Sequence, residues 1–302
     1  MRHLATFLLA AAIAVAPLRA ADKDKKADPS QIGNRDIGKG INFYSLEKEI
    51  ALGRQLAAEV ARQAKIVDDP LIAEYVNRVG QNLVRHSDAK VPFTFQVIQA
   101  DELNAFALPG GYVFVNTGLI KMAEDEDEFA GAVAHEIAHV AARHMTRQAT
   151  KSELANLLTV PLSVLLGGWT GAAIRQGANI AIPMTFLSFS RKDESEADYL
   201  GLQYMYAAGY DPLGAISILE KLESLSMRQP GAVSRLFSTH PMDTDRIRKA
   251  EKEIQEILPA RPQYVVTTSE YHDIRERLFD LESRQPPAPP QENRPTLMKT
   301  QP

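Results

Sequence analysis

Hydrophobic positions recur with helical spacing in several stretches of the chain. The clearest stretch begins at Asp69, a typical N-cap residue, and is followed by Pro70, which is favoured at the first helical position. Its apolar face consists of Leu71, Tyr75, Val76, Val79 and Leu83. Comparable patterns predict further helices over 45–65, 124–148, 191–208, 212–227 and 244–257.

Two short runs alternate hydrophobic with other residues, as half-buried strands do. They cover 92–99 and 111–116, and they are joined through a turn at 108–111 that contains Pro109, Gly110 and Gly111. A small antiparallel sheet is therefore expected beside the helix 124–148. Together with the many helices, this predicts an α+β fold that is predominantly α-helical.

The two ends of the chain differ in composition from the middle. Residues 1–20 have a positive start, an apolar run over 4–16 and small residues at the end, which is typical of a cleaved secretory signal; an uncleaved anchor is the alternative. Residues 21–43 are expected to form a charged, flexible leader and 285–302, with six prolines, a disordered tail. The folded domain would then span 44–284, outside the cytoplasm.

The stretch 154–174 contains no charged residue and has the length of a membrane span. Pro161 and the pair Gly167-Gly168 interrupt it, which argues against a continuous helix across a membrane. We expect 154–182 to form a helical hairpin that is buried or that touches a membrane peripherally.

Composition narrows the classes of function. The 302 residues are 45% hydrophobic and 24% charged, as in ordinary globular proteins. Removing residues 1–20, which hold Arg2 and Arg19, lowers the net charge from -4 to -6, so no basic field favours nucleic acid. The absence of cysteine excludes disulfides, thiolate metal ligands and a thiol nucleophile.

Candidate chemistry lies in the predicted helix 124–148, which contains the sequence HEIAH at 135–139. His135 and His139 are one helical turn apart, so both imidazoles can bind a single zinc ion. Glu136 lies next to the same face, where a carboxylate can take a proton from a zinc-activated water. The five-residue run of acids at 124–128 is interpreted as a solvated helix start.

A third ligand is needed to complete such a site. His144 lies five residues after His139, about 140 degrees further round a continuous helix, and is expected to have a structural or surface role. Glu194 opens a later helix and can bind zinc, while Asp198, one turn on, can accept a hydrogen bond from a ligand histidine. Glu196 is expected on the solvated side of that helix.

These motifs resemble the zinc metallopeptidase family that includes BepA, LoiP, HtpX and the CAAX prenyl endopeptidases. The residues that carry the resemblance are His135, Glu136, His139, Ser190, Arg191, Glu194, Ala197, Asp198, His240, Pro241 and Arg246, together with 104–111 and 117–119. It implies a zincin-type (gluzincin) fold and one Zn2+ per chain. His135, His139 and Glu194 would be the ligands, Glu136 the catalytic base, Asp198 its acidic partner in catalysis, and Arg246 a group near the substrate carbonyl.

Two features have more than one interpretation. The resemblance implies a regulatory role for His240, because in periplasmic relatives the histidine of the corresponding loop can bind the zinc and hold the enzyme inactive. The alternative is that His240 caps the helix 244–257. Gly110, Gly111, Tyr112 and Val113 would either form a free edge strand that pairs with an extended substrate or contain only a hairpin turn.

The resemblance and the signal sequence together favour a periplasmic zinc endopeptidase acting on unfolded or misassembled envelope proteins, with no nucleic-acid partner. The alternatives are a chaperone that binds unfolded outer-membrane proteins with its proteolysis latent, and a structural zinc protein. Retention of Glu136 favours the enzyme, because binding alone would need only the ligands. No pattern in the sequence indicates an oligomeric state.

Overall fold

The computed structural model describes residues 28–159, 188–242 and 245–284. The predicted signal sequence, its cleavage site, the proline-rich tail and most of the apolar stretch 154–182 lie outside these ranges. Among the residues described, no helix is both long and apolar enough to cross a membrane.

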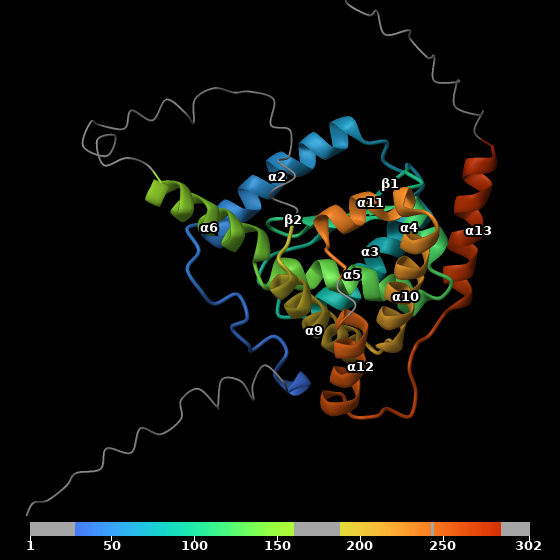
Figure 1. The fold of residues 1–302 in the computed structure, drawn as a ribbon. Coiled ribbons are helices and arrows are strands. Elements are labelled where there is room, and N and C mark those ends of the chain that lie inside the picture. Colours follow the sequence, from blue (N-terminus) through green and yellow to red (C-terminus); the bar gives the residue numbers. More distant parts are fainter. Residues whose placement is uncertain (1–27, 160–187, 243–244, 285–302) are drawn as a thin grey trace, which may run out of the picture.

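The described part of the chain is mainly helical (Figure 1). Its helices are η1 (Pro29–Gln31), α2 (Leu46–Gln63), α3 (Pro70–Arg85), α4 (Thr117–Met122), α5 (Glu126–Ala141), α6 (His144–Thr159), α9 (Arg191–Ala208), α10 (Leu213–Arg228), α11 (Pro230–Thr239), α12 (Asp245–Ile257) and α13 (Ser269–Ser283). Its strands are β1 (Thr94–Ile98), β2 (Ala105–Leu108) and β3 (Tyr112–Asn116).

Side chains cap the starts of α3 and α9, and the cap at Asp69 was predicted. The Asp69 side chain accepts hydrogen bonds from the first backbone N–H groups of α3. Ser190 and Asp193 form a reciprocal capping box at the start of α9. The predicted helix 124–148 is wrong in its extent, because the chain breaks between α5 and α6 at Arg143, whose φ of 57° is left-handed. Helices η1, α4, α11 and α13 were not predicted.

The sheet is mixed, so the predicted antiparallel sheet is only partly correct. Strand β3 lies in the centre and pairs with β1 in parallel and with β2 in antiparallel orientation. Strand β2 was not predicted; it forms the antiparallel hairpin with β3, which leaves β1 to pair with β3 in parallel. The α+β class and the helical majority are confirmed.

The predicted substrate edge at Gly110, Gly111, Tyr112 and Val113 is also wrong, because Tyr112 and Val113 belong to the central strand. The two glycines make the turn between β2 and β3, with φ of 74° and 91°. This favours the hairpin-turn interpretation. The outer strand near α5 is β2 instead.

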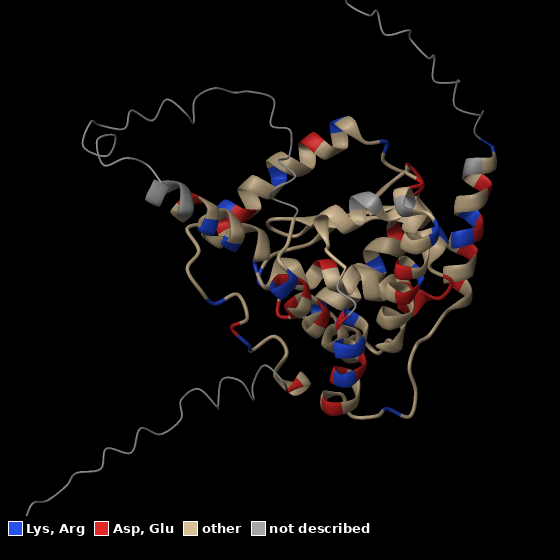
Figure 2. Cartoon of the chain, in the orientation of Figure 1, with Lys and Arg blue, Asp and Glu red and all other residues tan. Residues whose placement is uncertain are grey.

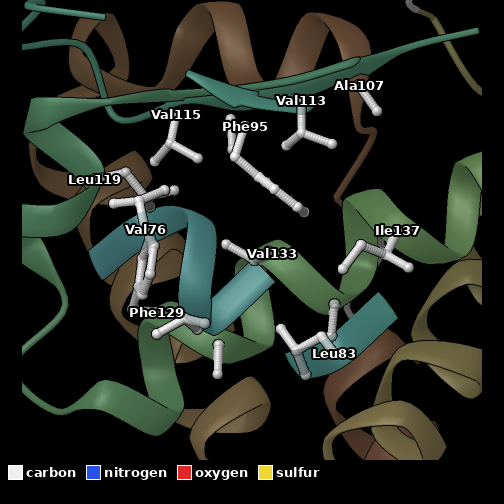
Figure 3. Close-up of a cluster of buried hydrophobic side chains, with 14 of the residues drawn as sticks. Val76, Leu83, Phe95, Ala107, Val113, Val115, Leu119, Phe129, Val133 and Ile137 are labelled. Carbon is white, nitrogen blue, oxygen red and sulfur yellow. The ribbon is translucent and has the colours of Figure 1, made fainter. Parts of the chain in front are cut away.

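Helix α5 runs through the middle of the main hydrophobic core (Figure 1). Val133 and Ile137 on this helix are fully buried, and Figure 3 shows them between the sheet residues Phe95 and Val113 and residues of α3 such as Leu83. Helices α9 and α10 pack on α5 as well. Burial on nearly all sides gives the helix a rigid position, which the side chains of a metal site require.

Residues 28–44 pack against the body, although 21–43 was expected to be a flexible leader. Ile37 is buried, and the Arg35 guanidinium forms a buried ion pair with Asp88. Tyr204 of α9 donates a hydrogen bond to the same carboxylate at 3.0 Å. Because a buried charge needs such partners, these contacts fix this part of the chain to α9 and to the end of α3.

The acidic run at 124–128 is not a simple solvated helix end. Glu126 and Glu128 are buried, and Glu126 accepts a hydrogen bond from the Tyr210 hydroxyl at 2.9 Å. Lys221 of α10 forms an ion pair with Glu128 at 2.7 Å. These acids therefore connect the start of α5 to α10 and its neighbours. Elsewhere, Figure 2 shows Lys, Arg, Asp and Glu interspersed along α12 and α13.

Candidate metal centre

Helix α5 brings His135 and His139 together, as their spacing predicted. Their Nε2 atoms are 3.0 Å apart, and His139 is fully buried while His135 is slightly exposed. The i, i+4 spacing places both rings on the same side of the helix. Phe189, just before α9, stacks on the His139 ring with centroids 3.8 Å apart and restricts its rotation.

Two further side chains meet this pair. Glu194, in the first turn of α9, places its Oε1 atom 3.3 Å from His139 Nε2 and its Oε2 atom 3.4 Å from His135 Nε2. His240, immediately after α11, places Nδ1 3.1 Å from Glu194 Oε1 and 3.3 Å from His135 Nε2. All four groups offer an atom within 4.8 Å of the others.

This arrangement fits zinc. Three imidazole nitrogens and one carboxylate oxygen are ligand types that zinc accepts. With bonds of 2.0–2.1 Å, a tetrahedral zinc ion separates its ligand atoms by about 3.3 Å. The separations of 3.0 to 3.4 Å between these ligand atoms agree with that spacing. The residues that would hold the metal are thus His135, His139 and Glu194, with His240 in position as a fourth ligand.

The candidate ligands have one acidic and one basic side chain beside them, Asp198 and Arg246. Asp198 Oδ1 lies 3.0 Å from His135 Nδ1, which is the nitrogen away from the other ligands. Burial disfavours the charged imidazole, but the hydrogen bonds to Asp198 and Glu194 outweigh it and raise the pKa of His135 to about 10. Burial alone would raise the pKa of Asp198, whereas Arg246 and His135 lower it.

Arg246 is buried and directed at carboxylates. It donates two hydrogen bonds to Asp198, at 2.8 and 2.7 Å, and its Nη1 lies 2.9 Å from Glu194 Oε2. The guanidinium therefore connects the candidate ligand Glu194 to Asp198, the partner of His135. The resemblance placed Arg246 near a substrate carbonyl; in the structure its contacts are with these two acids.

Glu136 is buried and faces a strand as well as the ligands. Its Oε2 accepts a hydrogen bond from the backbone N–H of Ala107 in β2 at 2.9 Å, and its Oε1 lies 3.4 Å from His240 Nε2. Burial raises its pKa, against the lowering effect of His240 and His135. A carboxylate with a raised pKa beside a metal site is well suited to accept and return a proton.

His144 and Glu196 differ from what was expected of them. His144 is almost completely buried and its Nδ1 lies 3.0 Å from His139 Nδ1, so its role is structural but not at the surface. Glu196 is not on a solvated face: its Oε2 lies 3.3 Å from His144 Nε2. The break at Arg143 explains the position of His144, because it redirects a side chain that a continuous helix would point elsewhere.

An apolar pocket of about 70 Å³ adjoins the candidate ligands. His135, Glu136, His240 and Arg246 line one side of it. The remaining lining is mostly aliphatic or aromatic, and its larger members are Leu202, Ile218, Leu219, Leu222, Leu236 and Phe237. An apolar side chain brought to the metal centre would find its complement there.

Comparison with known proteins agrees with the site. The beta-barrel assembly-enhancing protease of Yersinia pestis is 30% identical over 260 residues, covering 83% of this chain and 53% of the relative. The protein of that name from Escherichia coli K12 is 29% identical over 244 residues, covering 78% and 49%. Mitochondrial metalloendopeptidase OMA1 of Schizosaccharomyces pombe is 35% identical over 202 residues, covering 66% and 57%.

The chain thus spans about half the length of these relatives. Residues 70–254 match peptidase family M48, and this range includes every candidate ligand, Glu136, Asp198 and Arg246. The resemblance drawn from the motifs is confirmed, and the chain belongs to peptidase family M48.

Proposed function

We propose that this protein is a zinc-dependent endopeptidase. The observation that carries the proposal is the position of Glu136, buried next to three candidate ligands and fixed by the Ala107 N–H. Binding of a metal alone does not need this carboxylate. When bound, zinc supplies the positive charge that acidifies a water molecule and polarises a peptide carbonyl.

The side chains of this chain divide the remaining work. Glu136 takes the proton from the attacking water and returns it to the leaving amine, which its raised pKa favours. Asp198 holds the Nδ1 proton of His135, so that Nε2 is free to bind the metal. Strand β2 lies beside Glu136 as an outer strand, and an extended substrate could add to it through backbone hydrogen bonds.

We also propose a substrate class and a location. Two of the relatives described above are named as proteases that enhance β-barrel assembly, which supports misassembled envelope proteins as substrates and the periplasm as the compartment. The apolar pocket suits unfolded chains, because these expose the apolar side chains that folded proteins bury.

A second candidate is a chaperone or assembly factor with latent proteolysis. The position of His240 favours it, since a fourth protein ligand would close the site that a catalytic zinc keeps open for water. His240 on the metal is thus proposed as the resting state, and its departure would be needed for cleavage.

One experiment tests these proposals. The chain from residue 22 is purified, its zinc is measured by mass spectrometry, and casein cleavage is followed for the wild type, Glu136→Gln and His240→Ala. One zinc per chain with cleavage abolished in Glu136→Gln is expected, and His240→Ala should cleave faster than wild type. Zinc without cleavage in either the wild type or His240→Ala would favour the chaperone, and absence of zinc would refute the site.

A further inference from the structure

The helix that carries His135 and His139 ends at a break in the chain. Arg143 adopts the left-handed conformation, with φ of 57°, between the end of α5 and the start of α6. Such a conformation is unfavourable for a residue with a side chain and persists where neighbours hold it. Here Glu49 of α2 is the neighbour, because it accepts a hydrogen bond from Arg143 Nε at 2.8 Å.

The break at Arg143 places the side chain of His144 next to that of His139. His144 is the first residue of α6 and is 1% exposed. Its Nδ1 atom faces His139 Nδ1 at 3.0 Å, and its Nε2 atom faces Glu196 Oε2 at 3.3 Å. Arg147 lies 3.7 Å from the same oxygen of Glu196 and helps to hold that carboxylate in place.

The tautomers of His139 and His144 follow from which nitrogen of His139 is offered to the metal. A neutral His139 that offers Nε2 to a metal carries its hydrogen on Nδ1, so Nδ1 is a donor. His144 Nδ1 must then be the acceptor, which places the hydrogen of a neutral His144 on Nε2. That N–H points at Glu196, a group that accepts. Each polar atom in the series thus meets a partner of the opposite kind.

We propose that His144 and Glu196 are positioning residues for the metal ligand His139. The pair fixes the tautomer of His139, holds its ring in orientation and increases the electron density at Nε2, as Asp198 does for His135. Each of the two ligand histidines is then supported at its Nδ1 atom, His135 by a carboxylate directly and His139 by a carboxylate through a second imidazole. This inference rests on the zinc site proposed above.

Zinc affinity tests the pair without depending on peptide cleavage. Affinity is measured by competition with a chromophoric chelator for the wild type, His144→Leu and His144→Asn, and Co2+ spectra report the ligand field. His144→Leu removes the acceptor and should weaken zinc about 10- to 100-fold, with a shifted Co2+ spectrum. Asparagine keeps an acceptor near the position of Nδ1, so His144→Asn should stay within about threefold of wild type. His86→Leu is the matched control, because the His86 side chain is hydrogen-bonded to the Asn82 carbonyl at 2.8 Å and to none of the candidate ligands in the described part of the chain; this variant should bind zinc like wild type.

Each result decides the matter. Unchanged affinity in His144→Leu overturns the proposal, and so does equal weakening in His144→Asn, because packing and not the acceptor would then be responsible. If His144→Leu does not fold, Glu196→Leu replaces it: weaker zinc supports the pair and unchanged zinc overturns it. A wild-type chain that takes up no zinc would instead refute the proposed function itself.

Discussion

Arg246 and Asp198 form a two-pronged ion pair beneath the candidate metal centre, with hydrogen bonds of 2.8 and 2.7 Å. The pair is almost excluded from solvent, since the two side chains are 5% and 10% exposed. A buried charge that loses its partner is strongly unfavourable, because neither water nor another ion replaces the lost contact.

We therefore expect Arg246→Ala to destabilise the protein by about 3–5 kcal/mol. Arg246→Lys should recover only part of the loss, because an ammonium group cannot form the paired hydrogen bonds of a guanidinium. Urea denaturation followed by circular dichroism measures both variants. The matched control is Arg248→Ala, whose exposed ion pair with Asp245 should contribute less than about 1 kcal/mol. Equal decreases in the free energy of unfolding for Arg246→Ala and Arg248→Ala would show that the buried ion pair stabilises the protein no more than the exposed one.

Removal of zinc should lower thermal stability. A ligand present at 100 times its dissociation constant stabilises the native state by about 2.7 kcal/mol. For a domain of this size we expect a chelator to lower Tm by about 5–10 °C. His139→Ala, which removes a buried ligand, should give the same Tm with and without the chelator. A wild-type Tm that is the same with and without the chelator would contradict the metal site.

Glu253 gives a dependence of stability on pH that is separate from the metal. Burial, with a further contribution from Asp198, raises the pKa of this α12 carboxyl to about 7. The native state then keeps a proton that the unfolded chain has lost, so this group reduces stability as pH rises from about 4.5 to about 7. The contribution of Glu253 to the free energy of unfolding is therefore greatest at low pH, and it has been lost once the pH exceeds about 7.

Glu253→Gln should remove that penalty. We expect a gain of about 1–3 kcal/mol over wild type at pH 8 and no gain at pH 4. Chemical denaturation at several pH values measures the difference, and Glu256→Gln, at an exposed position on the same helix, is the control. A gain that is the same at both pH values would mean that the carboxyl does not titrate as stated.

Gly53 allows α2 to approach the β2–β3 turn. A Cβ atom added there would meet the Pro109 carbonyl oxygen at 1.8 Å, so the helix would have to move away. We expect Gly53→Ala to destabilise the protein by about 1–3 kcal/mol, as overpacked substitutions do. Gly231 is the control, because a Cβ at that position meets nothing within 4 Å. Its replacement by alanine should be neutral or slightly stabilising, and a comparable loss at both glycines would argue against the close approach.

The sequence predicted those parts of the site that depend on local spacing. His135 and His139 converge because they are four residues apart on one helix, and Glu194 and Asp198 are related in the same way. The strand order could not be predicted in this way, because β1 and β3 are direct neighbours in the sheet although β2, which was not recognised, lies between them in the sequence. Pairing of strands depends on distant contacts, which periodicity does not report.

His144 shows how one local error spreads. A continuous helix over 124–148 places its side chain about 140 degrees from His139, and only the left-handed residue before it reverses this. Arginine is not a residue from which a left-handed conformation is expected, so the sequence offered no signal. Glu196 was placed on the solvated side from its position on its own helix, and its contact with His144 is a distant one that this position does not report.

The hydrogen bond between Glu49 and Arg143 also bears on how the site comes into existence. This hydrogen bond joins the break after α5 to a residue 94 positions earlier in the chain. The contact between His135 and His240 joins α5 to a residue 105 positions later. Contacts of such separation form late, because the ends of a long loop must first be brought together at a cost in entropy. The ligands are therefore assembled only after the early and late parts of the chain have both closed on α5. A nascent chain would acquire its metal at the end of folding, so the proposed peptidase activity would arise only in a chain that has already closed both loops.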